Sequence, residues 1–178
     1  FFLEKGLDIN KGNNEGNTSL HELCKYANHG NEIQLLVKYG ADINKFNDKA
    51  ETPLIIACNN RKEDIIIELV ENGADINIQD TQGNTPFMIA CKKHASHYLL
   101  DYMIENGANI NKENNEGNTP LLELCKHSTY TNKIIKYDVD INKSNNKGET
   151  PLMIACRRGY KDVVMELVKH GADINKKR

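Results

Sequence analysis

Apolar residues recur along the chain in short groups with helical spacing, and not in strict alternation. In one such group Leu54, Ala57 and Cys58 fall on one face of a helix. A polar break follows, and residues 65–70 then form a second amphipathic stretch. This pattern predicts pairs of short helices, each helix burying one apolar stripe.

The helix pairs repeat with a fixed period. Asp-Ile-Asn, or Asn-Ile-Asn once, begins at residues 8, 42, 75, 109, 140 and 173, so the steps are 34, 33, 34, 31 and 33 residues. A threonine followed by Pro or Ser and by Leu or Phe recurs in the same phase, and it suits a helix start. These threonines are Thr18, Thr52, Thr85, Thr119 and Thr150. A unit of this size cannot bury its own apolar face, so we expect the units to stack.

Each unit also carries turn signals. The segment from Asp80 to Gly83 has an Asx residue first and glycine fourth, as tight turns prefer. A glycine such as Gly73 precedes the Asp/Asn-Ile-Asn tripeptide by two residues, where a left-handed residue is expected to end the second helix. Asp138 takes this place in the fourth unit, so we expect it to adopt the left-handed conformation at a small energetic cost.

These residues resemble the ankyrin repeat family, whose unit of about 33 residues is a β-turn and two helices with Thr-Pro-Leu-His-x-Ala near the first helix. The resemblance covers essentially all 178 residues. It implies an all-α ankyrin-repeat solenoid of antiparallel helix pairs with projecting β-turn or hairpin loops. The expected division is a partial repeat at 1–10, repeats at about 11–43, 44–76, 77–110, 111–141 and 142–174, and the start of another at 175–178. Neither end looks like a polar cap, so we expect a fragment of a longer chain.

Two departures from the family pattern affect the expectations. Only His21 keeps the motif histidine, which in the family is associated with hydrogen bonds to neighbouring turns. The fourth repeat is two residues short. Because a poor unit weakens its interfaces on both sides, we expect this repeat to be the least stable.

Charge and hydropathy restrict the partners. Twenty-three basic and 25 acidic residues leave a formal net charge of -2, which argues against nucleic acid or an anionic membrane as the main partner. The apolar runs are too short to span a bilayer, and we find no signal peptide or lipidation motif. Several cysteines that are expected to stay reduced fit an intracellular and specifically cytoplasmic protein.

Chemistry-bearing residues are few, and most fit a structural role. Cys24, Cys58, Cys91, Cys125 and Cys156 occupy the same position in each repeat, where we expect buried, unpaired thiols. Cys91, His94 and His97 come closest to a zinc signature, but both histidines should face solvent in the break between helices. The close pairs His21 with Cys24 and Cys125 with His127 lack an orienting third group. We therefore expect no metal, no cofactor and no enzymatic activity.

A lysine follows the Asp/Asn-Ile-Asn tripeptide in five of six units. These residues are Lys11, Lys45, Lys112, Lys143 and Lys176, and Ile78 interrupts the row. A solvated edge that opposes aggregation is the simpler interpretation. Binding of an acidic partner along the row stays open.

The remaining hypothesis is recognition of a protein partner by a monomeric array. In proteins that this chain resembles, turn tips and first helices line a concave groove, and surface positions there vary from repeat to repeat. We expect Phe46, Gln79, Glu113, Ser144, Asn84 and Asn118 to contact the partner. Two alternatives remain: a structural spacer within a larger multidomain protein, or a substrate-recruiting array of a parent enzyme.

Overall fold

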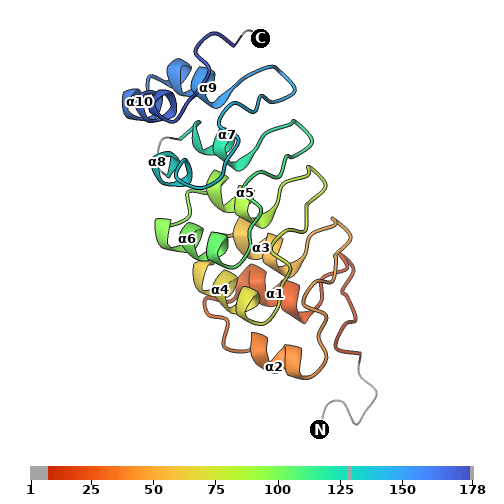
Figure 1. The fold of residues 1–178 in the computed structure, drawn as a ribbon. Coiled ribbons are helices and arrows are strands. Elements are labelled where there is room, and N and C mark those ends of the chain that lie inside the picture. The colour runs from red at the N-terminus through yellow and green to blue at the C-terminus, as the bar shows by residue number, and fades with distance from the viewer. Residues whose placement is uncertain (1–7, 128–129, 177–178) are drawn as a thin grey trace.

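The computed structural model describes residues 8–127 and 130–176, and within these ranges it contains ten helices and no strand (Figure 1). The helices are α1 (Ser19–Tyr26), α2 (Ile33–Lys38), α3 (Pro53–Asn59), α4 (Glu63–Glu71), α5 (Pro86–Lys92), α6 (His97–Glu105), α7 (Pro120–Leu124), α8 (Thr131–Ile134), α9 (Pro151–Arg158) and α10 (Lys161–Lys169). The predicted all-α architecture is therefore confirmed. No helix in the described ranges has the length and apolar character needed to cross a membrane.

The threonines begin the first helix of each pair as predicted. Thr52 Oγ1 accepts a hydrogen bond from the amide of Ile55 at 3.3 Å, and Pro53 occupies the first turn of α3. Thr85, Thr119 and Thr150 cap α5, α7 and α9 in the same way. Capping satisfies an amide that the helix cannot bond internally, and it fixes the point where the chain turns into the core.

The helix pairs stack in sequence order. The first helices α1, α3, α5, α7 and α9 form one row, and the second helices α2, α4, α6, α8 and α10 form another (Figure 1). The loops between successive pairs project on the side away from the second helices (Figure 1). One continuous apolar core runs between the rows, and residues such as Ile55, Phe87 and Leu122 are completely enclosed.

The fourth repeat absorbs its missing residues in its second helix. Helix α8 has four residues, whereas α4 and α6 have nine each. Asp138 is not in the left-handed region, so that prediction was wrong. Its carbonyl still accepts the Asn111 side-chain amide at 2.7 Å, as the Gly107 carbonyl accepts that of Asn77 at 3.0 Å. After the shortened helix, the Asp138 carbonyl therefore occupies the same position relative to the preceding repeat as the Gly107 carbonyl does, without the left-handed conformation of Gly107.

Candidate functional site

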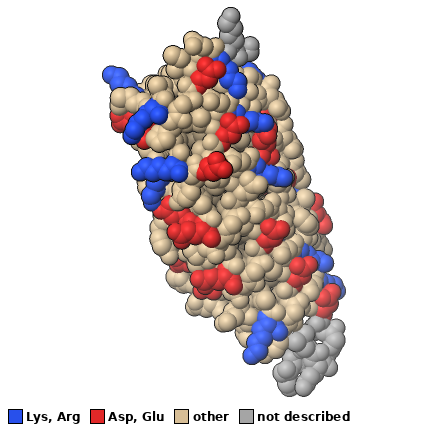
Figure 2. All heavy atoms as spheres, in the orientation of Figure 1, with Lys and Arg blue, Asp and Glu red and all other residues tan. Residues whose placement is uncertain are grey.

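Five turn loops and the exposed side of the first helices form one face of the array, which we call the inner face (Figure 1). The turn loops are residues 13–17, 47–51, 80–84, 114–118 and 145–149. On the molecular side that Figure 2 shows, acidic and basic side chains are interspersed, without a large region of one sign. Such a mixed surface does not favour a polyanion as ligand.

Each turn loop is held by its own first residue. In the fourth loop Asn114 Oδ1 accepts the amides of Glu116 and Asn118, both at 3.0 Å, and the Asn114 amide bonds the Asn118 carbonyl. Asn13, Asn47, Asp80 and Asn145 bond their own loops in the same way. The loops are therefore ordered without help from a ligand.

An asparagine ladder joins most of these loops. Asn47 Nδ2 donates to Asn17 Oδ1 at 2.8 Å, Asn114 Nδ2 donates to Asn84 Oδ1 at 2.9 Å, and Asn145 Nδ2 donates to Asn118 Oδ1 at 3.0 Å. Backbone hydrogen bonds accompany each step, for example from the Asn115 amide to the Gln82 carbonyl at 3.0 Å. Neighbouring turn loops are thus fixed relative to one another.

The ladder is interrupted between repeats two and three. Here the paired positions are Glu51 and Asp80, two carboxylates that cannot donate to one another. Among the described residues, no hydrogen bond joins loop 47–51 to loop 80–84, whereas a side-chain and a backbone bond join the loops at the other three junctions. Ala50, with φ of 55°, also stands where the other turns have glycine.

A second ladder runs along the Asp/Asn-Ile-Asn tripeptides. Asn77 Nδ2 donates to the Gly107 carbonyl at 3.0 Å, and its Oδ1 accepts the Asn109 amide at 2.8 Å. Asn10, Asn111 and Asn142 make the same two bonds to the next repeat. The repeated asparagine was visible in the sequence, but its role as a link between repeats was not recognised there.

A row of cationic side chains crosses the inner face, and sequence reasoning missed it. The last residue of each turn loop is followed eight positions later by Lys25, Asn59, Lys92, Lys126 or Arg157. Lys25 pairs with Glu15 at 3.6 Å, and Arg157 pairs with Glu149 at 2.6 Å. The eight-residue spacing was the available signal, because it brings a first-helix position against its own turn loop. Only Asn59 in repeat two lacks the charge.

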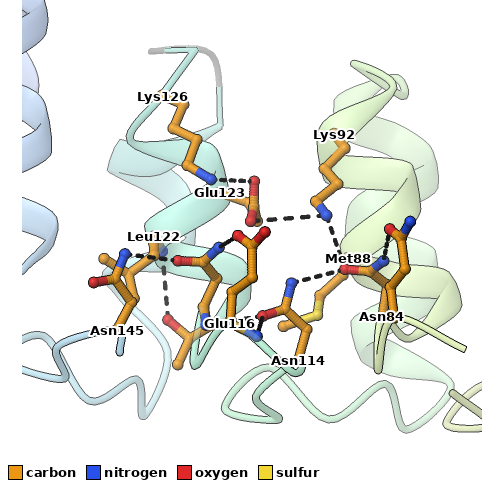
Figure 3. A network of polar contacts seen from close by, with 12 residues as sticks. Asn84, Met88, Lys92, Asn114, Glu116, Leu122, Glu123, Lys126 and Asn145 are labelled. Atoms are coloured by element: carbon orange, nitrogen blue, oxygen red, sulfur yellow. Dashed lines mark hydrogen bonds and ion pairs between the residues drawn. The ribbon is translucent and has the colours of Figure 1, made fainter. Parts of the chain in front are cut away.

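The centre of this row is built around a buried carboxylate (Figure 3). Glu123 is 2% exposed and its Oε2 accepts from Lys126 Nζ at 2.9 Å, while Lys92 Nζ lies 3.8 Å from Oε1. Lys92 also donates to Asn84 Oδ1 at 2.8 Å, so it ties α5 to its own turn loop and to α7. Glu123 Oε1 has no hydrogen-bond partner in the described structure. Two lysines are thereby held with part of their surface open to solvent.

The residues predicted to contact a partner lie in different environments. Phe46 is 50% exposed, and Glu113 is exposed and pairs with Lys143 at 2.8 Å. Gln79 is half-buried and donates to the carbonyls of Gly83 and Glu113. Ser144 is half-buried, whereas Asn84 and Asn118 are 3% and 1% exposed and belong to the ladder. The two ladder asparagines therefore offer little surface to a partner.

The edge lysines do not form one free row. Lys143 pairs with Glu113, and Lys176 Nζ donates to the Asn142 carbonyl at 2.6 Å. Lys11 and Lys112 are exposed, and Lys45 is half-buried. At least two of the five lysines therefore contribute to contacts between repeats.

Four of the five thiols are buried and one is not. Burial raises the pKa of the Cys24 and Cys125 thiols to about 12 and raises the pKa of Cys58 and Cys91 as well, so these groups stay protonated at neutral pH. Cys156 is exposed, which corrects the expectation that all five are buried. The four buried thiols lie in repeats that another described helix pair follows, whereas Cys156 lies in the last described pair.

The candidate zinc ligands Cys91, His94 and His97 do not form a metal site in the described structure. His94 and His97 are exposed as predicted, but His97 begins α6 and does not lie in the break between helices. The His94 ring meets His127 with centroids 4.4 Å apart, and the His97 ring lies 5.3 Å from that of Tyr130. Within residues 8–127 and 130–176 no group of three His, Cys, Asp or Glu side chains could hold a metal ion.

His21 is committed to structure. Its Nδ1 accepts the Thr18 amide at 3.1 Å, and its Nε2 lies 3.1 Å from the Glu51 carbonyl, so the expected link to the neighbouring turn is present. Burial lowers the pKa of His21, which favours the neutral ring that this pair of bonds requires.

Comparison with known proteins agrees with the geometry. A family model described as ankyrin repeats in three copies matches residues 1–80, 24–114 and 87–178. No curated protein matches the chain. Ankyrin repeats are generally protein–protein interaction modules and are typically non-catalytic. Since the matched segments together span residues 1–178, this chain belongs to the ankyrin-repeat family.

Proposed function

We propose that the array binds a protein partner across its inner face and carries out no chemistry of its own. The observation that carries this proposal is the row of charged side chains held in place before any partner arrives. Lys25, Lys92, Lys126 and Arg157 each contact a carboxylate on the same face. A surface whose side chains are already ordered loses less conformational entropy on binding.

The second helices are poorer candidates, because exposed charged residues there such as Lys38 and Glu71 make no hydrogen bond or ion pair with another described residue that would hold their side chains in place. The exposed residues Lys38, Glu71 and Lys169 represent this outer surface. By contrast, Phe46 directly precedes the ordered turn loop 47–51 and is a large exposed aromatic group. Aromatic and arginine side chains dominate the binding energy of most protein interfaces.

The experiment begins with a partner captured by the intact array and then compares two triple variants. Phe46→Ala, Glu113→Ala and Arg157→Ala together should weaken binding by about 1–4 kcal/mol with little change in melting temperature. The matched outer set, Lys38→Ala, Glu71→Ala and Lys169→Ala, should change neither. If the outer set abolishes binding and the inner set does not, the inner-face proposal is wrong. If no protein binds the array, a spacer role becomes the better account.

A further inference from the structure

Repeat five provides a template for a contact that repeat two lacks. Glu149 is the last residue of its turn loop, and its Oε2 accepts the Asn145 side-chain amide at 3.0 Å. Its Oε1 accepts the guanidinium of Arg157, eight residues later, at 2.6 Å. One carboxylate thus joins the turn loop to a cation on the first helix.

Repeat two has the same carboxylate without the cation. Glu51 Oε2 accepts the Asn47 side-chain amide at 3.2 Å, as in repeat five. The position eight residues later holds Asn59, whose side chain carries no charge. Glu51 Oε1 has no hydrogen-bond or ion-pair partner among the described residues.

A hollow of about 180 Å³ lies at this place on the inner face, and Glu51, Ile56, Asn59 and Asn60 are part of its lining. Ile56 is 6% exposed and offers a small apolar contact to the stem of a long side chain. The amide oxygens of the two asparagines can accept additional hydrogen bonds. The hollow lies between repeats one and two, because Glu15, Asn17 and Lys25 complete its lining together with Asn47 and Lys49.

Two lysines, Lys25 and Lys49, also line the hollow, but neither takes the place of the missing cation. Lys25 pairs with Glu15 at 3.6 Å. Lys49 stands two residues before Glu51, but Lys147 stands two residues before Glu149, and that carboxylate still pairs with Arg157. In repeat two, therefore, no described cationic side chain occupies the place beside Glu51 that Arg157 occupies beside Glu149.

We propose that an arginine side chain of a protein partner enters this hollow and pairs with Glu51 as Arg157 pairs with Glu149. The inference rests on the proposed function, since it names one anchor of the partner. Arginine fits better than lysine, because its planar guanidinium can bond a carboxylate and neighbouring amide oxygens at the same time. Its aliphatic stem can also cover Ile56.

The direct test uses N-acetyl-arginine amide as the probe and NMR shifts of the array as the readout. The probe should cause saturable shifts at the amides of Glu51, Ile56 and Asn59, with an affinity on the order of millimolar for so small a ligand. N-acetyl-citrulline amide has nearly the same shape without the charge and should cause none. Equal shifts with both probes, or no saturable shift at repeat two, would overturn the inference.

Three variants test whether the arginine probe binds at Glu51. Glu51→Gln keeps an oxygen for Asn47 but removes the charge, and it should weaken probe binding about tenfold or more. Glu116→Gln is the matched control: it removes the same charge from a turn loop in which Glu116 Oε2 accepts the side-chain amide of Asn118, and binding at repeat two should be unchanged. Asn59→Arg should fill the hollow from within and abolish the shifts. Undiminished binding to Glu51→Gln or to Asn59→Arg would contradict the inference.

The same variants separate this inference from the proposed function. If a captured partner depends on the inner face but binds Glu51→Gln and Asn59→Arg as tightly as the unaltered array, the inner-face proposal stands and the arginine anchor fails. If the partner ignores the inner-face triple variant while the arginine probe still binds at repeat two, the hollow is a guanidinium site but the proposed function is wrong.

Discussion

The side-chain amide of Asn114 donates a 2.9 Å hydrogen bond to Oδ1 of Asn84, and this bond is one step of the ladder that joins neighbouring turn loops. The ladder needs a donor in the later repeat and an acceptor in the earlier one. At the junction of repeats two and three both residues are carboxylates, so one well-placed substitution should complete it.

Asp80→Asn should raise the free energy of unfolding by about 1 kcal/mol. The new amide can donate to Glu51, and its oxygen can keep the bonds to the amides of Gln82 and Asn84. Urea denaturation measures the change. Asp42→Asn serves as control, because the Asp42 side chain makes a similar bond to the Asn44 amide but takes no part in the ladder that joins the turn loops. Equal changes in the free energy of unfolding for the two substitutions would mean that the loss of a negative charge, and not a new ladder bond, stabilises the protein.

Ala50→Gly should also stabilise this junction, by about 0.5–1 kcal/mol. Ala50 has φ of 55°, a left-handed conformation in which glycine carries no steric penalty. Ala57→Gly is the opposite case, since Ala57 lies inside α3 and glycine there should cost about 1 kcal/mol. Thermal melting of the two variants should therefore shift in opposite directions. A lower melting temperature for Ala50→Gly would contradict this reasoning.

His21 should make stability depend on pH. Burial lowers the pKa of His21 from its ordinary value of 6.5, so the unfolded chain takes up a proton at a pH where the folded protein does not. The stabilisation is complete above about 6.5 and is lost as pH falls toward the folded-state pKa, by at most about 1.4 kcal/mol per pH unit.

The measurement for His21 is the free energy of unfolding between pH 5 and 8, taken as the difference between the native chain and His21→Met. Repeats three and five carry methionine at the equivalent positions, Met88 and Met153, so the replacement suits the fold. The variant should be about 1 kcal/mol less stable at neutral pH, because the Glu51 carbonyl keeps the Asn47 amide but loses the His21 ring as a donor. The difference should shrink as pH falls. A difference that is constant with pH would exclude His21 as the titrating group.

Repeat four should open more readily than repeat two. Helix α8 has four residues, and a helix so short gains little from its own hydrogen bonds. Its main anchors are the bonds from Tyr130 and Lys133 to Asp101 on α6. Native-state hydrogen exchange should show less protection for residues 130–137 than for residues 65–71. Tyr130→Phe should increase this difference in protection. Equal protection of the two stretches would show that packing fully compensates for the short helix.

The periodic parts of the fold could be predicted because each marker residue has a local mechanical role. Thr52 caps the N-terminus of α3 with its own side chain, and Gly73 follows the end of α4 in the left-handed conformation, with φ of 91°. Asp138 was misjudged because its conformation depends on how a two-residue deletion is absorbed, which local sequence does not specify. Cys156 was misjudged because burial at that position depends on a neighbouring repeat and not on the residue itself.

The candidate site was harder to predict, because its charged groups meet only after stacking. The sequence places Lys92 and Glu123 in different repeats, and the 3.8 Å approach follows from the packing of α5 on α7. Asn84 and Asn118 look like variable surface residues in the sequence, but the ladder buries them. The absence of a cation at Asn59 has a meaning only by comparison with repeat five, in which Arg157 bonds Glu149 at the equivalent position.

The buried carboxylate of Glu123 should organise the inner face at some cost in stability. Ile56, Ile89 and Ile154 occupy the equivalent position in other repeats, and replacing a buried charge by a well-packed apolar side chain is often neutral or stabilising. Glu123→Ile should therefore leave the free energy of unfolding unchanged or raise it by about 1 kcal/mol. Removing both cations, by Lys92→Met with Lys126→Met, should instead lower it by about 3 kcal/mol, because the carboxylate stays buried without a partner. Urea denaturation distinguishes the two results, and a stability loss in Glu123→Ile as large as in the double variant would show that the ion pairs stabilise the fold.

Partner binding supplies the second measurement for Glu123→Ile. The substitution frees the Lys126 side chain from its 2.9 Å contact, so the affinity for a partner should fall although the free energy of unfolding does not.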